Sequence, residues 1–222
     1  MSGTWPSSPK FNAINFQINT PTLVTNTLSG LTRRIGMGHS FYSFTVKYNN
    51  ISRYDMGPII GFIAEQYGPL EKFQIVLPEI SYTKVGNQTT TIVVSAQGTY
   101  TGPTTTITIG TDTWTDTTGT HTGYLAGSDH IMVSNVASGK NLLRAGDFFK
   151  FANHDKVYMC TTTWTTGNPL YFSGSLVKNV PNGTALVIDQ VPFTVILNST
   201  LQQVDVGIGG ITQIQLDMKE AW

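Results

Sequence analysis

The sequence predicts a mainly β protein, in which one antiparallel β-domain with a single flanking α-helix is interrupted by a small inserted β-domain. Three observations predict it. Apolar and polar residues alternate in residues 41–48 and 73–77, which is the period of a strand with one buried face. A helical pattern lies between these two stretches. Two further alternating stretches follow only near the end of the chain, after a segment of different composition.

The helix is expected to begin near Ser52 or Asp55, because either side chain can accept a hydrogen bond from a free amide of the first turn. Gly68 and Pro69 are expected to end it, since Gly accepts a left-handed C-cap and Pro cannot continue a helix. Helical spacing places four apolar residues on one face, with the first three as the helix core: Ile59, Ile60, Ile63 and Tyr67.

Two strands and one helix do not close a core, so the complement is expected in residues 192–219. Phe193, Val195 and Leu197 alternate there with Thr194, Ile196 and Asn198. The last strand places apolar residues on one face and four polar residues on the other: Gln213, Gln215, Asp217 and Lys219. Residues 14–18 add one more strand, and Leu23 is the expected apolar contact of the next. We therefore assign 1–80 plus 191–222 to one discontinuous domain and 81–190 to the insertion.

The insertion is expected to have two parts. Residues 83–122 are rich in threonine, which favours extended chain, and predict irregular strands with long exposed loops. Residues 129–189 are more regular, with paired strands on either side of 153–155 and a tight turn at Gly146-Asp147. Pro181-Asn182-Gly183 predicts a hairpin turn. This part is expected to form a small β-barrel or sandwich of its own.

Composition excludes several classes of function. The chain has 222 residues, a formal charge of +0 and 12% charged residues. Without a basic surplus, sequence-specific DNA binding is not expected, whereas self-association is permitted because like subunits do not repel. No apolar run reaches the roughly 20 residues of a membrane-spanning helix. The N-terminus lacks the pattern of a signal peptide, so synthesis in a cytosol is expected.

Residue clusters that carry chemistry are few. Cys160 and His154, with Asp147 or Asp155, suggest a nucleophile, but Cys160 lies in an apolar alternating run typical of a core residue. The spacing of His121 and His130 among acidic residues (Asp112, Asp116 and Asp129) matches no metal-ligand motif. We therefore predict no enzyme activity, no metal and no cofactor.

Two weaker signals concern binding. Arg33-Arg34 before Gly36 and Gly38 allow a phosphate-binding loop, although a solvated turn between strands is the favoured interpretation. Four aromatic residues of the insertion allow sugar stacking but are more often core residues in small β-domains: Trp114, Tyr124, Trp164 and Tyr171.

Several short motifs occur in a characteristic order. They are Trp5-Pro6, Leu28-Ser29-Gly30 with Arg33, the helix start Ser52-Arg53-Tyr54-Asp55, Phe73-Gln74-Ile75-Val76-Leu77-Pro78, Leu143-Arg144-Ala145-Gly146-Asp147-Phe148 and Val191-Pro192-Phe193. In this order the chain resembles the minor tail and baseplate proteins of tailed bacteriophages, and is similar in organisation to distal tail, or tail-tube-initiator-like, proteins.

The resemblance implies a tube-type fold of two packed antiparallel sheets with one flanking helix, assembled as a ring, with a hexamer expected before a trimer. It implies a structural role in the virion at the junction of the tail tube and the baseplate hub, assembled in the host cytoplasm. The partners are then further copies of the chain, the tail tube protein and hub proteins. Gln213, Gln215, Asp217 and Lys219 would face a lumen through which DNA passes non-specifically. The alternatives are a module in which the insertion binds a host-surface glycan, and a hydrolase using Cys160 and His154.

Overall fold

The structure is a computed structural model that describes residues 3–26, 28–36, 39–77, 93–95, 98–101, 106–109, 112–116, 119–134, 143–165, 167–199, 204–206 and 210–222. It divides into two compact units. The sheet unit comprises residues 1–75 and 193–222, and the inserted unit comprises residues 76–192. These boundaries lie within a few residues of the expected ones.

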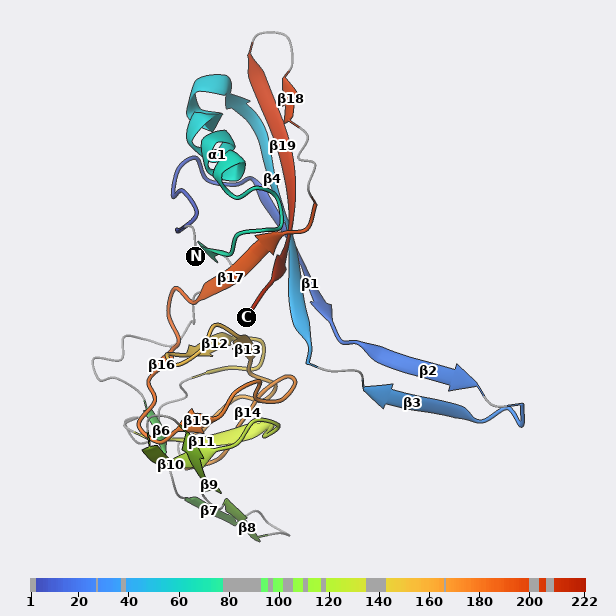
Figure 1. The fold of residues 1–222 in the computed structure, drawn as a ribbon, viewed down its shortest axis with the longest axis vertical. Helices are drawn as coiled ribbons and strands as arrows, with labels where there is room; N and C mark the ends of the chain where they lie inside the picture. Colours follow the sequence, from blue (N-terminus) through green and yellow to red (C-terminus); the bar gives the residue numbers. More distant parts are fainter. Residues whose placement is uncertain are drawn as a thin grey trace. The chain divides into compact units, whose positions relative to one another are not determined.

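The sheet unit contains a six-stranded sheet built from both ends of the chain. The strand order is β1 (Ala13–Asn19), β4 (Phe41–Ser52), β19 (Ile211–Glu220), β17 (Pro192–Leu197) and β5 (Phe73–Val76), with β18 (Val204–Val206) also pairing with β19. Neighbours β1–β4, β4–β19 and β19–β17 are antiparallel. β4 and β19 run side by side at the centre of the sheet (Figure 1). The expectation that the end of the chain completes the first strands is thus confirmed.

One face of this sheet forms the core of the sheet unit. The apolar residues of the predicted alternation are buried on β4, β5, β17 and β19: Tyr42, Phe44, Val46, Tyr48, Phe73, Ile75, Phe193, Val195, Leu197, Ile214, Leu216 and Met218. Phe44 and Phe193 meet edge to face with ring centroids 5.0 Å apart. The opposite face carries the polar residues of the same strands.

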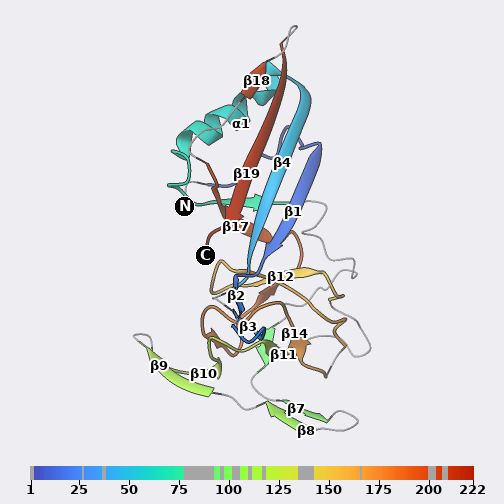
Figure 2. The ribbon, with the colours of Figure 1, turned by 90° about the vertical axis from the view of Figure 1, so that its right-hand side faces the viewer.

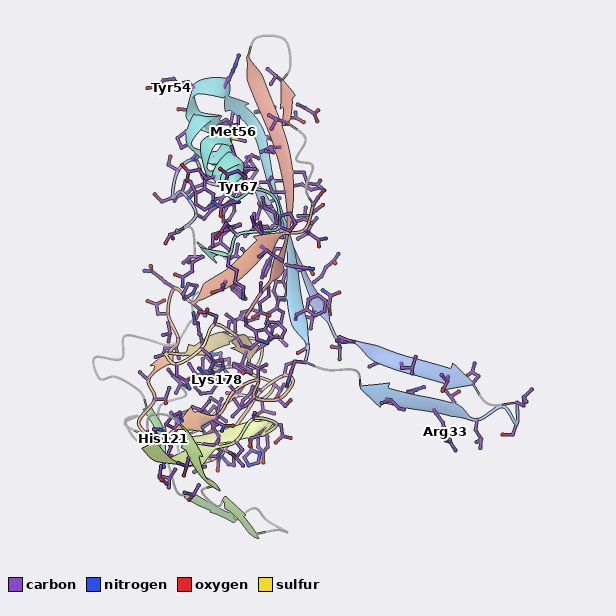
Figure 3. The ribbon with its side chains drawn as sticks, viewed as in Figure 1. Arg33, Tyr54, Met56, Tyr67, His121 and Lys178 are labelled. Atoms are coloured by element: carbon purple, nitrogen blue, oxygen red, sulfur yellow. The ribbon has the colours of Figure 1, made fainter. Side chains whose placement is uncertain are left out.

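The helix α1 (Arg53–Glu65) packs on the apolar face of the sheet, against β4 and β19 (Figure 2). Ser52 caps it, with its Oγ accepting a hydrogen bond from the Asp55 amide at 3.2 Å. Ile59 is fully buried, as predicted, and Ile60 and Ile63 are half-buried. Met56, which the sequence pattern did not single out, is fully buried and points toward the sheet, whereas Tyr54 points away (Figure 3).

The predicted end of the helix is too late. α1 ends at Glu65 with Gln66 as its C-cap, and Tyr67 and Gly68 then have positive φ angles of 50° and 69°. Tyr67 was expected on the buried face, but its side chain is 77% exposed. The helical period no longer applies after Glu65, so spacing alone placed this residue wrongly.

The N-terminal segment is tied to the sheet by backbone hydrogen bonds. The Trp5 amide donates to the Gln74 carbonyl at 2.7 Å, and the Gln74 amide donates to the Gly3 carbonyl at 3.0 Å. The Trp5 ring is buried between Phe62 and Phe73, with centroid distances of 5.3 Å and 5.6 Å. A single Trp outside any periodic pattern carries no signal of such packing in the sequence.

Strands β2 (Thr22–Asn26) and β3 (Thr32–Gly36) form a two-stranded hairpin. All residues of both strands are exposed, and the expected apolar contact of Leu23 is therefore wrong. Arg33 and Arg34 lie within β3, which ends at Gly36. The connection to β4 includes Gly38, which lies outside the described residues, so the turn considered there stays a prediction.

The inserted unit consists of small sheets. In three sheets, two strands flank a central one: β9 (Asp112–Asp116) and β15 (Val180–Pro181) flank β10 (Gly119–Tyr124), and β6 (Val93–Ser95) and β14 (Leu170–Tyr171) flank β11 (His130–Ser134). In the third, β13 (Val157–Met159) and β16 (Leu186–Val187) flank β12 (Phe148–Phe151). A fourth sheet is the pair β7 (Gly98–Thr101) and β8 (Thr106–Ile109). The described strands do not close into a barrel. Much of the threonine-rich stretch lies outside the described residues.

A hydrophobic core formed by its own residues holds the inserted unit together, including Phe149, Phe151, Tyr158, Trp164 and Leu170. The pairing of β12 with β13 is as predicted. The turn at 144–147 is also confirmed, with the Asp147 amide donating to the Arg144 carbonyl at 3.0 Å.

Residues 181–184 form a turn, but the predicted hairpin is wrong. The Thr184 amide donates to the Pro181 carbonyl at 3.2 Å, and Gly183 supplies the positive φ of 81°. The flanking strands β15 and β16 pair with β10 and β12 respectively, and not with each other.

Candidate functional site

The polar face of the main sheet brings together the four polar residues predicted on the last strand. In register, Gln215 lies opposite Lys47, Asp217 opposite Thr45 and Lys219 opposite Ser43. The edge strand β1 adds residues opposite β4 on the same side. The term polar face is used below for this set: Asn15, Gln17, Asn19, Ser43, Thr45, Lys47, Gln213, Gln215, Asp217 and Lys219.

Cross-strand hydrogen bonds order part of the polar face. The Thr45 hydroxyl donates to Asp217 Oδ1 at 2.6 Å, and Asn19 Nδ2 donates to Ser43 Oγ at 2.8 Å. Its charged members are Lys47, Lys219 and Asp217, and the others are amides and hydroxyls. Such a surface holds water and offers a polyanion little net attraction, because amides and hydroxyls are neutral.

The sheet has an unpaired edge beside this face. In the described part of the chain β1 pairs only with β4, so its other side has no strand partner. At the opposite end of the sheet, the N-terminal segment bridges β5 at Gln74. The apolar residues Ile14 and Phe16 of β1 are only half-buried. An unpaired strand with a partly exposed apolar side is a template for pairing with another chain.

An open, polar cleft of about 760 Å³ lies between residues 8–12 and the beginning of α1. Asn12, Asn49 and Asn50 line its wall. Its carboxylate, Asp55, accepts a hydrogen bond from Ser52 Oγ at 2.7 Å and thereby belongs to the helix cap. The Ser52–Asp55 pair is thus engaged in capping α1 and not poised for catalysis.

Cys160 and His154, the candidate catalytic pair, each have another partner. Cys160 is buried, its thiol donates to the Thr162 carbonyl at 2.8 Å, and burial raises its pKa to about 11. A thiol with this pKa is almost entirely protonated at neutral pH, so it is a poor nucleophile.

His154 belongs to a hydrogen-bond network that joins separate segments of the inserted unit. Its Nε2 lies 2.9 Å from Tyr158 Oη, and its Nδ1 lies 2.7 Å from Asn153 Oδ1. Asn153 Oδ1 can only accept, so Nδ1 carries the proton and donates to it; the Tyr158 hydroxyl, which accepts from the Val177 amide at 3.1 Å, then donates to Nε2. Burial, followed by nearby Lys178 and Lys150, lowers the His154 pKa to about 4. The neutral ring therefore serves this network.

The candidate metal ligands are not gathered in the described part of the chain. His130 Nδ1 lies 2.7 Å from Asp129 Oδ1, a contact between sequence neighbours. The side chains of Asp112 and Asp116 lie outside the described residues, and those that are described hold no group of three or more His, Cys, Asp or Glu suited to a metal.

Of the four aromatic residues considered for sugar stacking, Tyr124 and Trp164 are buried. Tyr124 Oη accepts a hydrogen bond from the Met132 amide at 2.9 Å, and Trp164 Nε1 donates to the Asn168 carbonyl at 2.8 Å. Tyr171 is half-buried beside His130, and the side chain of Trp114 lies outside the described residues. Tyr124 and Trp164 thus serve the core, and their rings are not available to a sugar.

Neither a scan against protein-family models nor a search of curated proteins found a match. None of the helices described has the length and apolar character needed to cross a membrane.

Proposed function

We propose that the chain is a ring-forming structural protein of a bacteriophage tail, of the distal tail class, located where the tail tube meets the baseplate hub. In this proposal the sheet unit has a tube-type fold and the protein acts by assembly, without a reaction or a cofactor. The observation that carries the proposal is the combination of a polar sheet face with an unpaired edge in the same sheet.

The two features have complementary roles in a ring. Pairing at the β1 edge continues the sheet of one copy toward the next, and the near-zero formal charge of the chain leaves no net repulsion between copies. Closing the ring turns the polar face inward as the wall of a channel. Its amides and hydroxyls keep the wall wet, and its single positive net charge (two lysines against one aspartate) gives DNA little to bind. A hexamer is the first expectation and a trimer the second.

The tail tube protein and hub proteins are the proposed neighbours, and the assembled virion is the proposed location. The glycan-binding alternative has less support, because two of its four aromatic residues are core residues. The hydrolase alternative lacks a reactive thiol, since burial keeps Cys160 protonated.

Mass photometry and negative-stain microscopy of the purified chain test the ring. Particles with six or three times the 24.2 kDa mass of the chain and a central channel are expected. A monomer at every concentration up to the solubility limit would overturn the proposal.

A paired variant tests the channel wall. Gln215→Arg with Asp217→Arg adds three positive charges per chain to the polar face. The variant ring is expected to retain DNA in a salt-dependent manner, while the wild-type ring does not. Tyr54→Lys with Glu65→Lys, at exposed positions outside the polar face, adds the same three charges and serves as the control for a general gain of positive charge. Equal DNA retention by wild type and the Arg variant would contradict the assignment of this face to the channel.

A further inference from the structure

We infer that the β2–β3 hairpin is an assembly arm that docks on a second copy of this chain. The inference rests on the proposed ring and names the part by which one copy holds the next.

The first observation is that the hairpin has no packing partner in its own unit. All residues of its two five-residue strands are exposed. No other labelled element of the sheet unit covers either face of the hairpin (Figure 1). A lone two-stranded ribbon is marginally stable at best in water, so a lasting hairpin requires a surface to lie on.

The second observation is a concentration of apolar side chains. Among the described residues, eleven large hydrophobic side chains are exposed, and five of them lie between positions 23 and 35: Leu23, Val24, Leu28, Leu31 and Ile35. Leu23 and Ile35 are cross-strand partners and form an apolar pair on one face. Burying such a pair against a partner is favourable, because it removes apolar surface from water that stays exposed in the isolated chain.

Charge favours a second copy as the occupant. Residues 21–36 contain Arg33 and Arg34 but no Asp or Glu. Subtracting these two arginines from the 13 basic residues of the chain leaves 11, against 13 acidic ones. The rest of the chain is therefore opposite in sign to the hairpin, which favours their encounter.

The same arginines argue against a nucleic acid as the occupant. Adjacent residues of a strand point to opposite faces, so Arg33 and Arg34 do not converge on one phosphate. Arg33 extends away from the ribbon (Figure 3).

Position and size agree with this occupant. Asn19 and Phe41 are the last pair of the β1–β4 ladder, so the hairpin leaves the sheet at the end of its unpaired edge strand. A standard interface uses roughly 20–30 residues on each side. Residues 22–36 supply about half of that number, and in a ring each copy both gives an arm and receives one.

Photo-crosslinking tests the contact directly. The crosslinking amino acid p-benzoylphenylalanine replaces Val24 in one sample and Ile35 in another, both within the full-length chain. Irradiation is expected to yield covalent dimers and higher multimers of the chain. Products confined to single chains, at concentrations where the wild type forms rings, would overturn the arm.

A matched pair of variants tests its contribution to assembly. Leu23→Ser with Ile35→Thr is expected to raise the protein concentration needed for assembly at least tenfold, without changing the melting temperature of the monomer. Leu70→Ser removes another exposed apolar side chain of the sheet unit and is expected to leave assembly unchanged.

The two proposals fail in different ways. If the wild type stays monomeric, the ring proposal fails and the arm fails with it. If the wild type forms rings and the Leu23/Ile35 variant assembles at the same concentration, the arm is wrong while the ring proposal stands.

Discussion

Trp5 and Tyr48 illustrate at the residue scale how an isolated side chain can complete a core. Trp5 Nε1 donates to Tyr48 Oη at 3.0 Å, and both rings are buried. Burial raises the pKa of Tyr48 to about 12, although the hydrogen bond from Trp5 acts in the opposite direction. The phenol is therefore neutral at every pH at which the protein is handled, and it remains a suitable acceptor for the indole.

Trp5→Ala is expected to destabilise the sheet unit by about 3–5 kcal/mol, because it empties the space between Phe62 and Phe73 and leaves Tyr48 without its donor. Chemical denaturation measures the loss. Tyr54→Ala, at a side chain that is 91% exposed, is the control and should change stability by no more than about 0.5 kcal/mol. Equal effects of the two variants would show that the N-terminal segment is not part of this core.

The His154 network predicts a pH dependence. The ring has an ordinary pKa of 6.5, which burial lowers to about 4 in the folded chain. Between these values the unfolded chain binds a proton that the folded chain does not. The contribution of His154 to stability is therefore complete above pH 6.5, and it is lost progressively as the pH falls toward 4.

Urea denaturation across this pH range measures the effect. His154→Gln removes the titrating group and should be less stable than wild type at neutral pH, with a weaker dependence on pH between about 6.5 and 4. Parallel losses of stability in wild type and variant across that range would mean that other groups, and not His154, account for the acid sensitivity.

At the scale of elements, α1 shows where local patterns succeed and fail. Its cap at Ser52 and its buried Ile59 follow from residues close in sequence. Its end does not, because Gln66 and Tyr67 leave the helix before the glycine that was expected to stop it. The deeply buried positions are Met56 and Ile59, whereas Ile63 is only half-buried.

Ile59→Asp places an unpaired carboxylate in this apolar contact and is expected to cost several kcal/mol, enough to unfold the sheet unit. Glu65→Lys, at an exposed position of the same helix, should leave the melting temperature unchanged. Thermal melts followed by circular dichroism compare the two variants. A folded Ile59→Asp variant, or a large shift in Glu65→Lys, would show that α1 does not cover the sheet as described.

At the scale of the whole molecule, the chain forms two units, and the inserted unit interrupts the sequence of the sheet unit. Among the described residues, the core of the inserted unit is formed by residues between 124 and 188, and the sheet unit is completed by strands from both ends of the chain. Each unit thus has the buried side chains that independent folding requires.

Replacing residues 81–190 by a short Gly/Ser linker is therefore expected to leave a folded sheet unit, because loop-closure cost changes slowly with loop length. Cooperative unfolding of this shortened chain, and separately of residues 76–192 expressed alone, is the measurement. An insoluble or non-cooperative product from both would show that the two units share a core.

The sequence by itself determined the features that depend on near neighbours. Alternation identified the buried faces of β4, β5, β17 and β19, the capping chemistry placed the start of α1, and the composition shift placed the insertion. Alternation also identified the polar residues of β19. Ser43, Thr45 and Lys47 alternate in the same way in β4, but spacing alone does not show that they lie on the same face as the polar residues of β19.

Only the tertiary structure decided which strands are neighbours. It placed β19 between β4 and β17, separated the strands that flank the 181–184 turn, set Trp5 into a core and left both faces of the β2–β3 hairpin exposed. The physical reason is that periodicity reports which side of a strand is apolar. Register and burial depend on contacts between residues far apart in the chain, and these are settled only when the whole sheet forms.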